Sequence, residues 1–379
     1  MWPGIIMARR TDAAPADAAT SANCMTHVDS RLALLQEWLV NEARVRAERI
    51  EPASSDASFR RYFRVFAAGR TLIIMDAPPE QEDVRAYLKV SALLEELGAH
   101  VPRVHQADEA RGLVLLEDLG ATHYLSELAA GADPEPLYRD ALEVLARIQA
   151  RGARAAQELP PYDRDALLRE LTLMPEWFCA RHLALELSAE ERELLASSFE
   201  FLIREGLAQP QVFVHRDYHS RNLMVVAERN PGVLDFQDAL RGPLGYDLVS
   251  LLKDCYISWP RERVVRWVGA HRERLVAHGF KQCGSERELL RGFDLIGVQR
   301  HLKVLGIFAR LWYRDGKPGY LQDLALTLRY VLATCLEYPE LHELGRFLER
   351  RAAAELVRAN ARVDAQLARG VRPVSQVGR

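Results

Sequence analysis

The sequence VFVHRDYHSRNLMVV occupies residues 212–226, and GVLDFQD follows it at residues 232–238. Both stretches contain the short apolar runs typical of buried strands, and RNPG at residues 229–232, where they meet, has the composition of a turn. This pattern predicts a hairpin that carries a polar loop in front of its first strand. Folding of that hairpin would bring the side chains of Asp217, Asn222 and Asp235 to one end.

These three residue types, in this order, suit the chemistry of phosphoryl transfer. In that chemistry Asp217 would orient an acceptor hydroxyl and take its proton, while Asn222 and Asp235 would hold Mg²⁺ on the phosphates of a nucleotide. Mg²⁺ prefers oxygen ligands and needs few from the protein, because phosphates and waters supply the rest. The alternative is a chance His-Arg-Asp and an ordinary aspartate at a strand end. The joint pattern on a strand-loop-strand context favours the catalytic interpretation.

The composition narrows the class of protein. The chain has 379 residues, of which 49% are hydrophobic and 27% charged, and its net charge is −3. Such a chain can form two or three packed units, and its charge gives no electrostatic reason to bind nucleic acid. No apolar run approaches the length of a membrane span. The five scattered cysteines form no C-x-x-C pair, which favours reduced thiols in the cytoplasm over disulfides or a zinc site.

We expect four segments along the chain. Residues 1–30 are Ala-rich and lack the continuous apolar core of a secretory signal, so we expect a disordered extension, with Met25 as an alternative start. Residues 31–119 are expected to form a nucleotide-binding lobe. Residues 120–348 are expected to form a catalytic and substrate lobe, and residues 349–379 a helical or disordered tail.

The first lobe is predicted to be a small α+β unit. Helices are predicted at residues 31–47 and 80–97, and strands at residues 59–66, 71–75, 101–107 and 112–116. The small residues at 54–58 are placed to cover phosphates through backbone N–H groups. They include no glycine, so an ordinary polar connection is the alternative. The backbone at Glu117–Leu119 is placed to bind the edge of adenine.

One departure from the kinase pattern concerns a lysine. Protein kinases carry it on the strand that here reads Leu72–Asp76, and this strand has none. We expect Arg60, Arg61 or Arg64 to reach the phosphates instead, with a solvated strand face as the alternative. The nucleotide-binding residues expected in this lobe are Ser55, Ser58, Arg60, Arg64, Glu117 and Leu119.

The second lobe is predicted to be helical from residue 122 onward. The clearest helices are predicted at residues 135–150, 163–185, 189–206, 248–256, 262–277 and 286–311. Ser188 and Glu191 form a capping-box pattern before the third of these. Asp247 stands at the start of the fourth, where we expect a structural role as a helix cap; a brace for the catalytic loop is the alternative.

The motifs resemble those of the aminoglycoside phosphotransferase-like kinases. The matching stretches are HRD at residues 215–217, Asn222, LDFQD at residues 234–238, and GPLGYD at residues 242–247. The resemblance implies a bilobal, protein-kinase-like α+β fold. In it a small antiparallel-sheet lobe and a larger, mostly helical lobe clamp ATP.

Within that superfamily the chain looks closer to the bacterial anomeric sugar kinases of cell-wall recycling, which act on N-acetylmuramate and N-acetylglucosamine. The supporting stretches are SDASFRRYFR at residues 55–64, MDAPP at residues 75–79, and residues 299–317. The resemblance implies a cytoplasmic and monomeric enzyme that uses ATP and Mg²⁺. In it, Asp217 accepts the proton of the sugar's C1 hydroxyl, which attacks the γ-phosphoryl group in line.

The residues expected to contact the sugar are His219, Arg221, Asp254, Arg300, His301 and Lys303. The last three share one predicted helix, where a solvated face is the alternative to a substrate pocket. Two other functions stay open. A kinase of an aminoglycoside antibiotic would favour an acidic pocket, and a non-catalytic nucleotide-binding regulator would explain the missing lysine. The intact Asp217 argues against the regulator.

Overall fold

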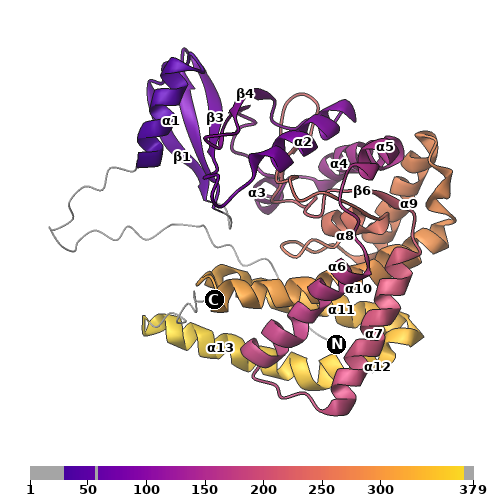
Figure 1. Cartoon of the computed structure of the whole chain (residues 1–379). Coiled ribbons are helices and arrows are strands. Elements are labelled where there is room, and N and C mark those ends of the chain that lie inside the picture. Colours follow the sequence, from indigo (N-terminus) through magenta and orange to yellow (C-terminus); the bar gives the residue numbers. More distant parts are fainter. Residues whose placement is uncertain (1–29, 56–58, 371–379) are drawn as a thin grey trace.

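A five-stranded antiparallel sheet forms the centre of the first lobe in the computed structural model, which describes residues 30–55 and 59–370 (Figure 1). The strands are β1 (Arg49–Ser55), β2 (Arg61–Ala67), β3 (Arg70–Asp76), β4 (Val104–Asp108) and β5 (Leu113–Glu117), in the order β1-β2-β3-β5-β4. The extension expected at the N-terminus lies outside the described residues.

Both faces of this sheet are covered. On β3, Leu72 and Ile74 pack against α1 (Ser30–Asn41), whereas Met75 on the opposite face belongs to the core that includes α2 (Val84–Glu96). The same alternation holds on β5, since successive side chains of a strand point to opposite faces. Burial on both faces explains why these two strands are continuously apolar in sequence. In Figure 1 α1 and α2 flank the sheet.

Strand β1 was not predicted, and the first helix ends at Asn41, six residues earlier than expected. Pro52 lowers the strand signal of β1 because proline cannot donate a hydrogen bond to a neighbouring strand. The structure tolerates it because β1 is an edge strand, and the pairing with β2 shifts register between Pro52 and Ser54. The predicted loop at residues 54–58 therefore begins inside a strand.

The second lobe is mostly helical, and its core helices surround α10. Its elements are α3 (Tyr124–Ala129), α4 (Pro134–Arg151), α5 (Ala153–Gln157), α6 (Arg164–Leu173), the π-helix η1 (Met174–His182), α7 (Ala189–Leu207), β6 (Gln211–Val214), β7 (Leu223–Met224), β8 (Gly232–Val233), β9 (Leu240–Pro243), α8 (Gly245–Leu252), α9 (Arg261–Ala277), η2 (Lys281–Cys283), α10 (Glu286–Tyr313), η3 (Pro318–Asp323), α11 (Leu324–Glu337), η4 (Pro339–Leu341), α12 (His342–Phe347), the π-helix η5 (Leu348–Ala353) and α13 (Ala354–Ala368). The single helix predicted at residues 163–185 is thus an α-helix followed by a π-helix.

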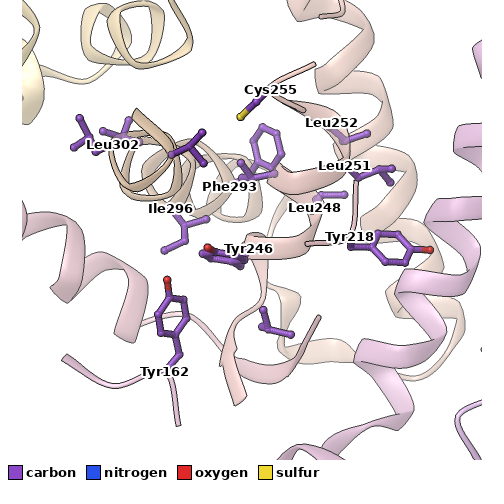
Figure 2. Packing of buried hydrophobic residues seen from close by; sticks show 14 of the residues in the cluster. Tyr162, Tyr218, Tyr246, Leu248, Leu251, Leu252, Cys255, Phe293, Ile296 and Leu302 are labelled. Atoms are coloured by element: carbon purple, nitrogen blue, oxygen red, sulfur yellow. The ribbon is translucent and has the colours of Figure 1, made fainter. Parts of the chain in front are cut away.

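Helix α10 is the central element of this lobe, in contact with α6, η1, α7, α8, α9 and α11. Gly306 allows η1 and α6 to approach closely, because a Cβ atom there would lie 2.4 Å from the backbone carbon of Leu173. Figure 2 shows part of the resulting core, in which Phe293 and Ile296 of α10 lie near Tyr246 of α8. Because α10 is buried, it holds the helices that pack against it in fixed positions.

The predicted hairpin forms, with one correction. Strands β7 and β8 pair antiparallel, as expected, but β6 pairs with β9 rather than with β7. The loop at residues 215–222 therefore connects two separate ribbons, and its position depends on both. The capping box of Ser188 and Glu191 is present at the start of α7.

Two expectations, one on membrane-spanning segments and one on the cysteines, can be compared with the described residues. None of their helices is long and apolar enough to cross a membrane. The four cysteines that they include, Cys179, Cys255, Cys283 and Cys335, are buried free thiols.

Candidate active site

The loop between β6 and β7 holds Asp217 in a tight turn. The backbone N–H of His219 donates to the carbonyl of Asp217 at 3.0 Å, and that carbonyl also accepts the side-chain amide of Asn222 at 3.0 Å. Arg216 has a φ of +78°, in the left-handed region that side chains rarely adopt. Residues held in such a conformation cluster at functional sites. The carboxylate of Asp217 is left 43% exposed.

Asn222 and Asp235 lie side by side where the hairpin begins. The amide of Asn222 donates to one carboxylate oxygen of Asp235 at 3.3 Å, and Gln237 donates to the other at 2.8 Å. Asp235 also has a positive φ, of +61°. The structure thus brings Asp217, Asn222 and Asp235 together, as the hairpin pattern predicts.

Asp247 holds the backbone of the catalytic loop in place. Its carboxylate accepts the backbone N–H groups of His215 at 2.6 Å and Arg216 at 2.9 Å, although it belongs to the first turn of α8. Burial raises the pKa of Asp247 to about 7, against the effect of these two hydrogen bonds. The expected helix cap is wrong, since Leu244 holds that position. Asp247 is the brace of the loop.

Asp254 has a similar supporting role. It accepts hydrogen bonds from the backbone N–H and the hydroxyl of Ser220, and from the backbone N–H of Tyr256. Both carboxylate oxygens are therefore bound to the protein, and Asp254 is fully buried. The structure does not place it where it would contact a sugar.

The three basic side chains expected on α10 are buried, so the solvated face considered for them is excluded. Lys303 contacts Glu170 at 2.9 Å and the hydroxyl of Tyr246 at 3.0 Å. His301 bonds to the carbonyl of Lys253 at 2.9 Å and is buried. Arg300 alone points at the catalytic loop, with its guanidinium 3.9 Å from the carboxylate of Asp217.

These cations set the charge state of Asp217. Burial acts to raise the pKa of its carboxyl group, but the positive charges of Lys303 and Arg300 outweigh it and lower that pKa to about 2. Burial lowers the pKa of His219 itself, which favours its neutral form. Asp217 is therefore ionised at neutral pH and surrounded by groups that stabilise negative charge.

A pocket of about 450 Å³ opens between the two lobes beside these residues. Its walls from the first lobe include Glu117 and Leu119, where adenine is expected, and Arg64. Arg64 is held in place by Asp118, whose carboxylate it contacts at 2.7 and 3.0 Å. The walls from the second lobe include His219, Arg221, Asn222, Met224, Leu234, Asp235, Tyr256 and Tyr320. Ser58 and the side chain of Ser55 lie outside the described part of the chain.

Among the three arginines that could replace the missing lysine, Arg60 lies close to Asp235, which lines this pocket. Its guanidinium lies 3.9 Å from the carboxylate of Asp235 and 3.9 Å from that of Glu82, just before α2. Arg61 instead contacts Asp76, at 2.5 and 3.0 Å, on the strand that carries the lysine in protein kinases. Asp76 is fully buried and also binds Arg31 of α1.

Sequence reasoning did not single out Glu82, Tyr256, Tyr320 or the orienting role of Gln237. Glu82 is separated from Arg60 by two strands, so only the folded sheet makes them neighbours. Tyr256 follows α8 and Tyr320 lies in η3, and no motif links these two aromatic residues in sequence. The proximity of Gln237 to Asp235 along the chain was the one available signal.

Comparison with known proteins agrees with this geometry. A model of the phosphotransferase enzyme family matches residues 49–280. The chain belongs to the phosphotransferase enzyme family. The fold agrees too: an ethanolamine kinase from Plasmodium vivax superposes with a TM-score of 0.58 at 12% identity, over 86% of this chain and 92% of that one.

Two relatives of this phosphotransferase have the same name, N-acetylmuramate/N-acetylglucosamine kinase. The one from Pseudomonas aeruginosa is 48% identical over 78% of this chain and 87% of its own length. The one from Pseudomonas putida is 42% identical over 86% of this chain and 97% of its own. The predicted bilobal fold and the predicted class of ATP-dependent phosphotransferase are confirmed.

Proposed function

We propose that this phosphotransferase transfers the γ-phosphoryl group of ATP to the C1 hydroxyl of N-acetylmuramate and N-acetylglucosamine, in the recycling of cell-wall peptidoglycan. The similarity to relatives that bear the name of these two sugars supports the choice of substrate. The observation that carries the reaction is the partly exposed carboxylate of Asp217 beside the paired Asn222 and Asp235.

In this reaction Asp217 holds the sugar hydroxyl by accepting its hydrogen bond. The pKa of about 2 makes Asp217 a weak base, so its main contribution is to aim the hydroxyl oxygen at the phosphorus and to receive the proton as the new bond forms. No covalent enzyme intermediate is required. Positioning and neutralisation of charge therefore account for most of the rate gain.

The residues present fit a Mg²⁺ site of the kind that nucleotide phosphates complete. Asn222 and Asp235 supply neighbouring oxygen-bearing side chains. The described residues contain no cluster of three or more His, Cys, Asp or Glu that would hold a metal by itself. Mg²⁺ keeps few protein ligands in such sites and, when bound, neutralises charge on the phosphates. Gln237 would orient Asp235 toward the ion.

For ATP itself we propose that the adenine lies against Glu117–Leu119 and that the phosphates extend toward Asp235. Arg60 then reaches the phosphates with Glu82 as its partner, in the place of the lysine–glutamate pair of protein kinases. Arg64 would border the nucleotide at the pocket wall. A monomer in the cytoplasm, where ATP is abundant, completes the proposal.

The surroundings of Asp217 do not favour an aminoglycoside as acceptor. Aminoglycosides are polycations, and the nearest charged side chain behind Asp217 is that of Arg300, with Lys303 also close enough to lower the pKa of Asp217. A neutral or anionic sugar suits this site better. A non-catalytic regulator would have no use for a proton acceptor held by so many contacts.

The test is release of ADP from Mg-ATP by the purified protein with N-acetylmuramate, N-acetylglucosamine or kanamycin. We expect turnover on both amino sugars, none on their C1-methyl glycosides, and a sugar 1-phosphate product visible by ³¹P NMR. Asp217→Asn is the control and should lower turnover by about 10²- to 10⁴-fold. Turnover on kanamycin alone, or phosphorylation of the C1-blocked sugars, contradicts the proposal.

A further inference from the structure

A second feature of the pocket is an arginine stacked on one aromatic ring and close to a second. The guanidinium carbon of Arg221 lies 3.6 Å from the ring centre of Tyr256 and 5.7 Å from that of Tyr320. All three residues line the pocket that Asn222 and Asp235 also line. Stacking on aromatic faces fixes the plane of a guanidinium and leaves its edge available for hydrogen bonds.

This guanidinium has no ion-pair partner within the part of the chain that the structure describes. Asp323 interacts with it electrostatically but forms no ion pair with it. Burial raises the pKa of Asp323 to about 7, so near neutral pH a large share of this carboxyl group carries a proton. The charge of Arg221 is therefore only partly offset inside the pocket, which favours an anionic group of the ligand.

We propose that Arg221, stacked on Tyr256, forms a subsite for the carboxylate of an acidic sugar. This inference rests on the proposed function. N-acetylmuramate differs from N-acetylglucosamine by a lactyl ether at O3 that ends in a carboxylate. A guanidinium matches a carboxylate with two parallel hydrogen bonds. Arg221 belongs to the same loop as Asp217. In the proposed arrangement the C1 hydroxyl of the sugar meets Asp217 and its O3 substituent meets Arg221. The subsite distinguishes the two sugars.

Comparison of the kinetics of the two sugars tests the subsite. We would measure kcat and KM for both with the wild type, Arg221→Gln and Arg221→Lys. For Arg221→Gln we expect kcat/KM for N-acetylmuramate to fall about 10- to 100-fold, the effect of losing a charge-assisted hydrogen-bonded pair. N-acetylglucosamine, which has no carboxylate, should change less than about 2-fold on the same principle. Arg221→Lys should recover part of the loss, because it keeps the charge.

Arg204 provides a matched control, since it also stacks on an aromatic ring, that of Phe201, but on the surface of α7. Arg204→Gln should leave both sugars unaffected. An equal loss for both sugars in Arg221→Gln overturns the subsite and makes Arg221 a positioning residue of the loop. A raised KM for ATP with unchanged sugar kinetics also overturns it, in favour of a nucleotide contact.

If the proposed function is wrong, the wild type turns over neither sugar, and this result differs from each of the kinetic outcomes above. Binding of N-acetylmuramate by calorimetry still tests the subsite in that case. Binding to the wild type that is lost in Arg221→Gln supports the carboxylate subsite. Equal binding to both proteins, or binding to neither, overturns it.

Discussion

The guanidinium of Arg300 lies 3.9 Å from the carboxylate of Asp217, on the buried side of the catalytic loop. Arg300 comes from α10 and is only 4% exposed, so its charge is fixed relative to the loop. It is one of the positive charges that hold the pKa of Asp217 down. A cation at this distance orients the carboxylate without pairing tightly with it, which leaves Asp217 able to accept a hydroxyl proton.

We expect Arg300→Met to raise the pKa of Asp217, because it removes one of the positive charges that lower it. A depressed carboxyl pKa protects activity as the pH falls, so the variant should lose kcat at a higher pH than the wild type does. Arg300→Lys, which keeps the charge, should retain the wild-type acid limb. Identical pH–rate profiles for the wild type and Arg300→Met would contradict this role, provided that both proteins unfold at the same temperature.

Substitutions of Asp217 and of Asp235 should impair the enzyme in different ways. Asp217→Asn is expected to lower kcat by about 10²- to 10⁴-fold with little change in the KM for ATP, because it acts on the acceptor. Asp235→Asn should raise both the KM for ATP and the Mg²⁺ concentration needed for half-maximal rate. Titration of Mg²⁺ at fixed ATP separates the two. A normal Mg²⁺ requirement in Asp235→Asn would remove it from the metal site.

Arg60 is expected to contribute to nucleotide binding in the place of the strand lysine. Arg60→Gln should raise the KM for Mg-ATP about 10- to 100-fold, as expected for loss of a charged hydrogen-bonding group, with little effect on the KM for the sugar. The neighbouring Arg61 is the control, because it is committed to Asp76. Arg61→Gln should lower thermal stability and leave the KM for Mg-ATP near the wild-type value. Similar kinetics for the two variants would refute the assignment.

Asp247 should make stability depend on pH in a defined window. Its folded-state pKa is about 7 against an ordinary value of 3.8, so the folded protein keeps a proton that the unfolded chain releases. The contribution of this carboxyl group is full below about pH 4 and is lost as the pH rises to about 7. The loss amounts to at most about 4 kcal/mol.

The measurement is denaturant unfolding of the wild type and Asp247→Asn from pH 4 to pH 8. The difference in unfolding free energy between them should shift in favour of Asp247→Asn as the pH rises, and level off above about pH 7. We also expect a lower kcat for Asp247→Asn, because an amide cannot accept both backbone N–H groups. A difference in stability that does not vary with pH would show that Asp247 is ionised throughout.

The sequence was sufficient for the bilobal fold and for the cluster of Asp217, Asn222 and Asp235. Each of these residues stands at the end of a short strand or in a short loop, so local patterns specify their arrangement. The apolar run from Leu72 to Met75 likewise predicted a strand, which the structure buries on both faces. Patterns of this kind fail where proline interrupts them, as at Pro52.

Local sequence patterns could not predict the role of the basic residues of α10. A cluster such as Arg300 and Lys303 usually marks a solvated face, and only the packing of several helices around α10 buries it. One signal was available, because residues 295–313 contain no Asp or Glu and are mostly apolar. A helix of that composition is buried all round. The partners Glu170 and Glu82 lie too far along the chain for any pattern to connect them.

The aspartate at the end of β3 has a consequence for inhibitor design. Covalent compounds that target the strand lysine of protein kinases depend on an amine nucleophile in the nucleotide site. Here that strand ends in Asp76, a carboxylate that two arginines hold out of solvent. Such compounds would find no amine to modify on this strand. Reversible compounds that carry an anionic group aimed at Arg60 would, for the same reason, distinguish this enzyme from the protein kinases.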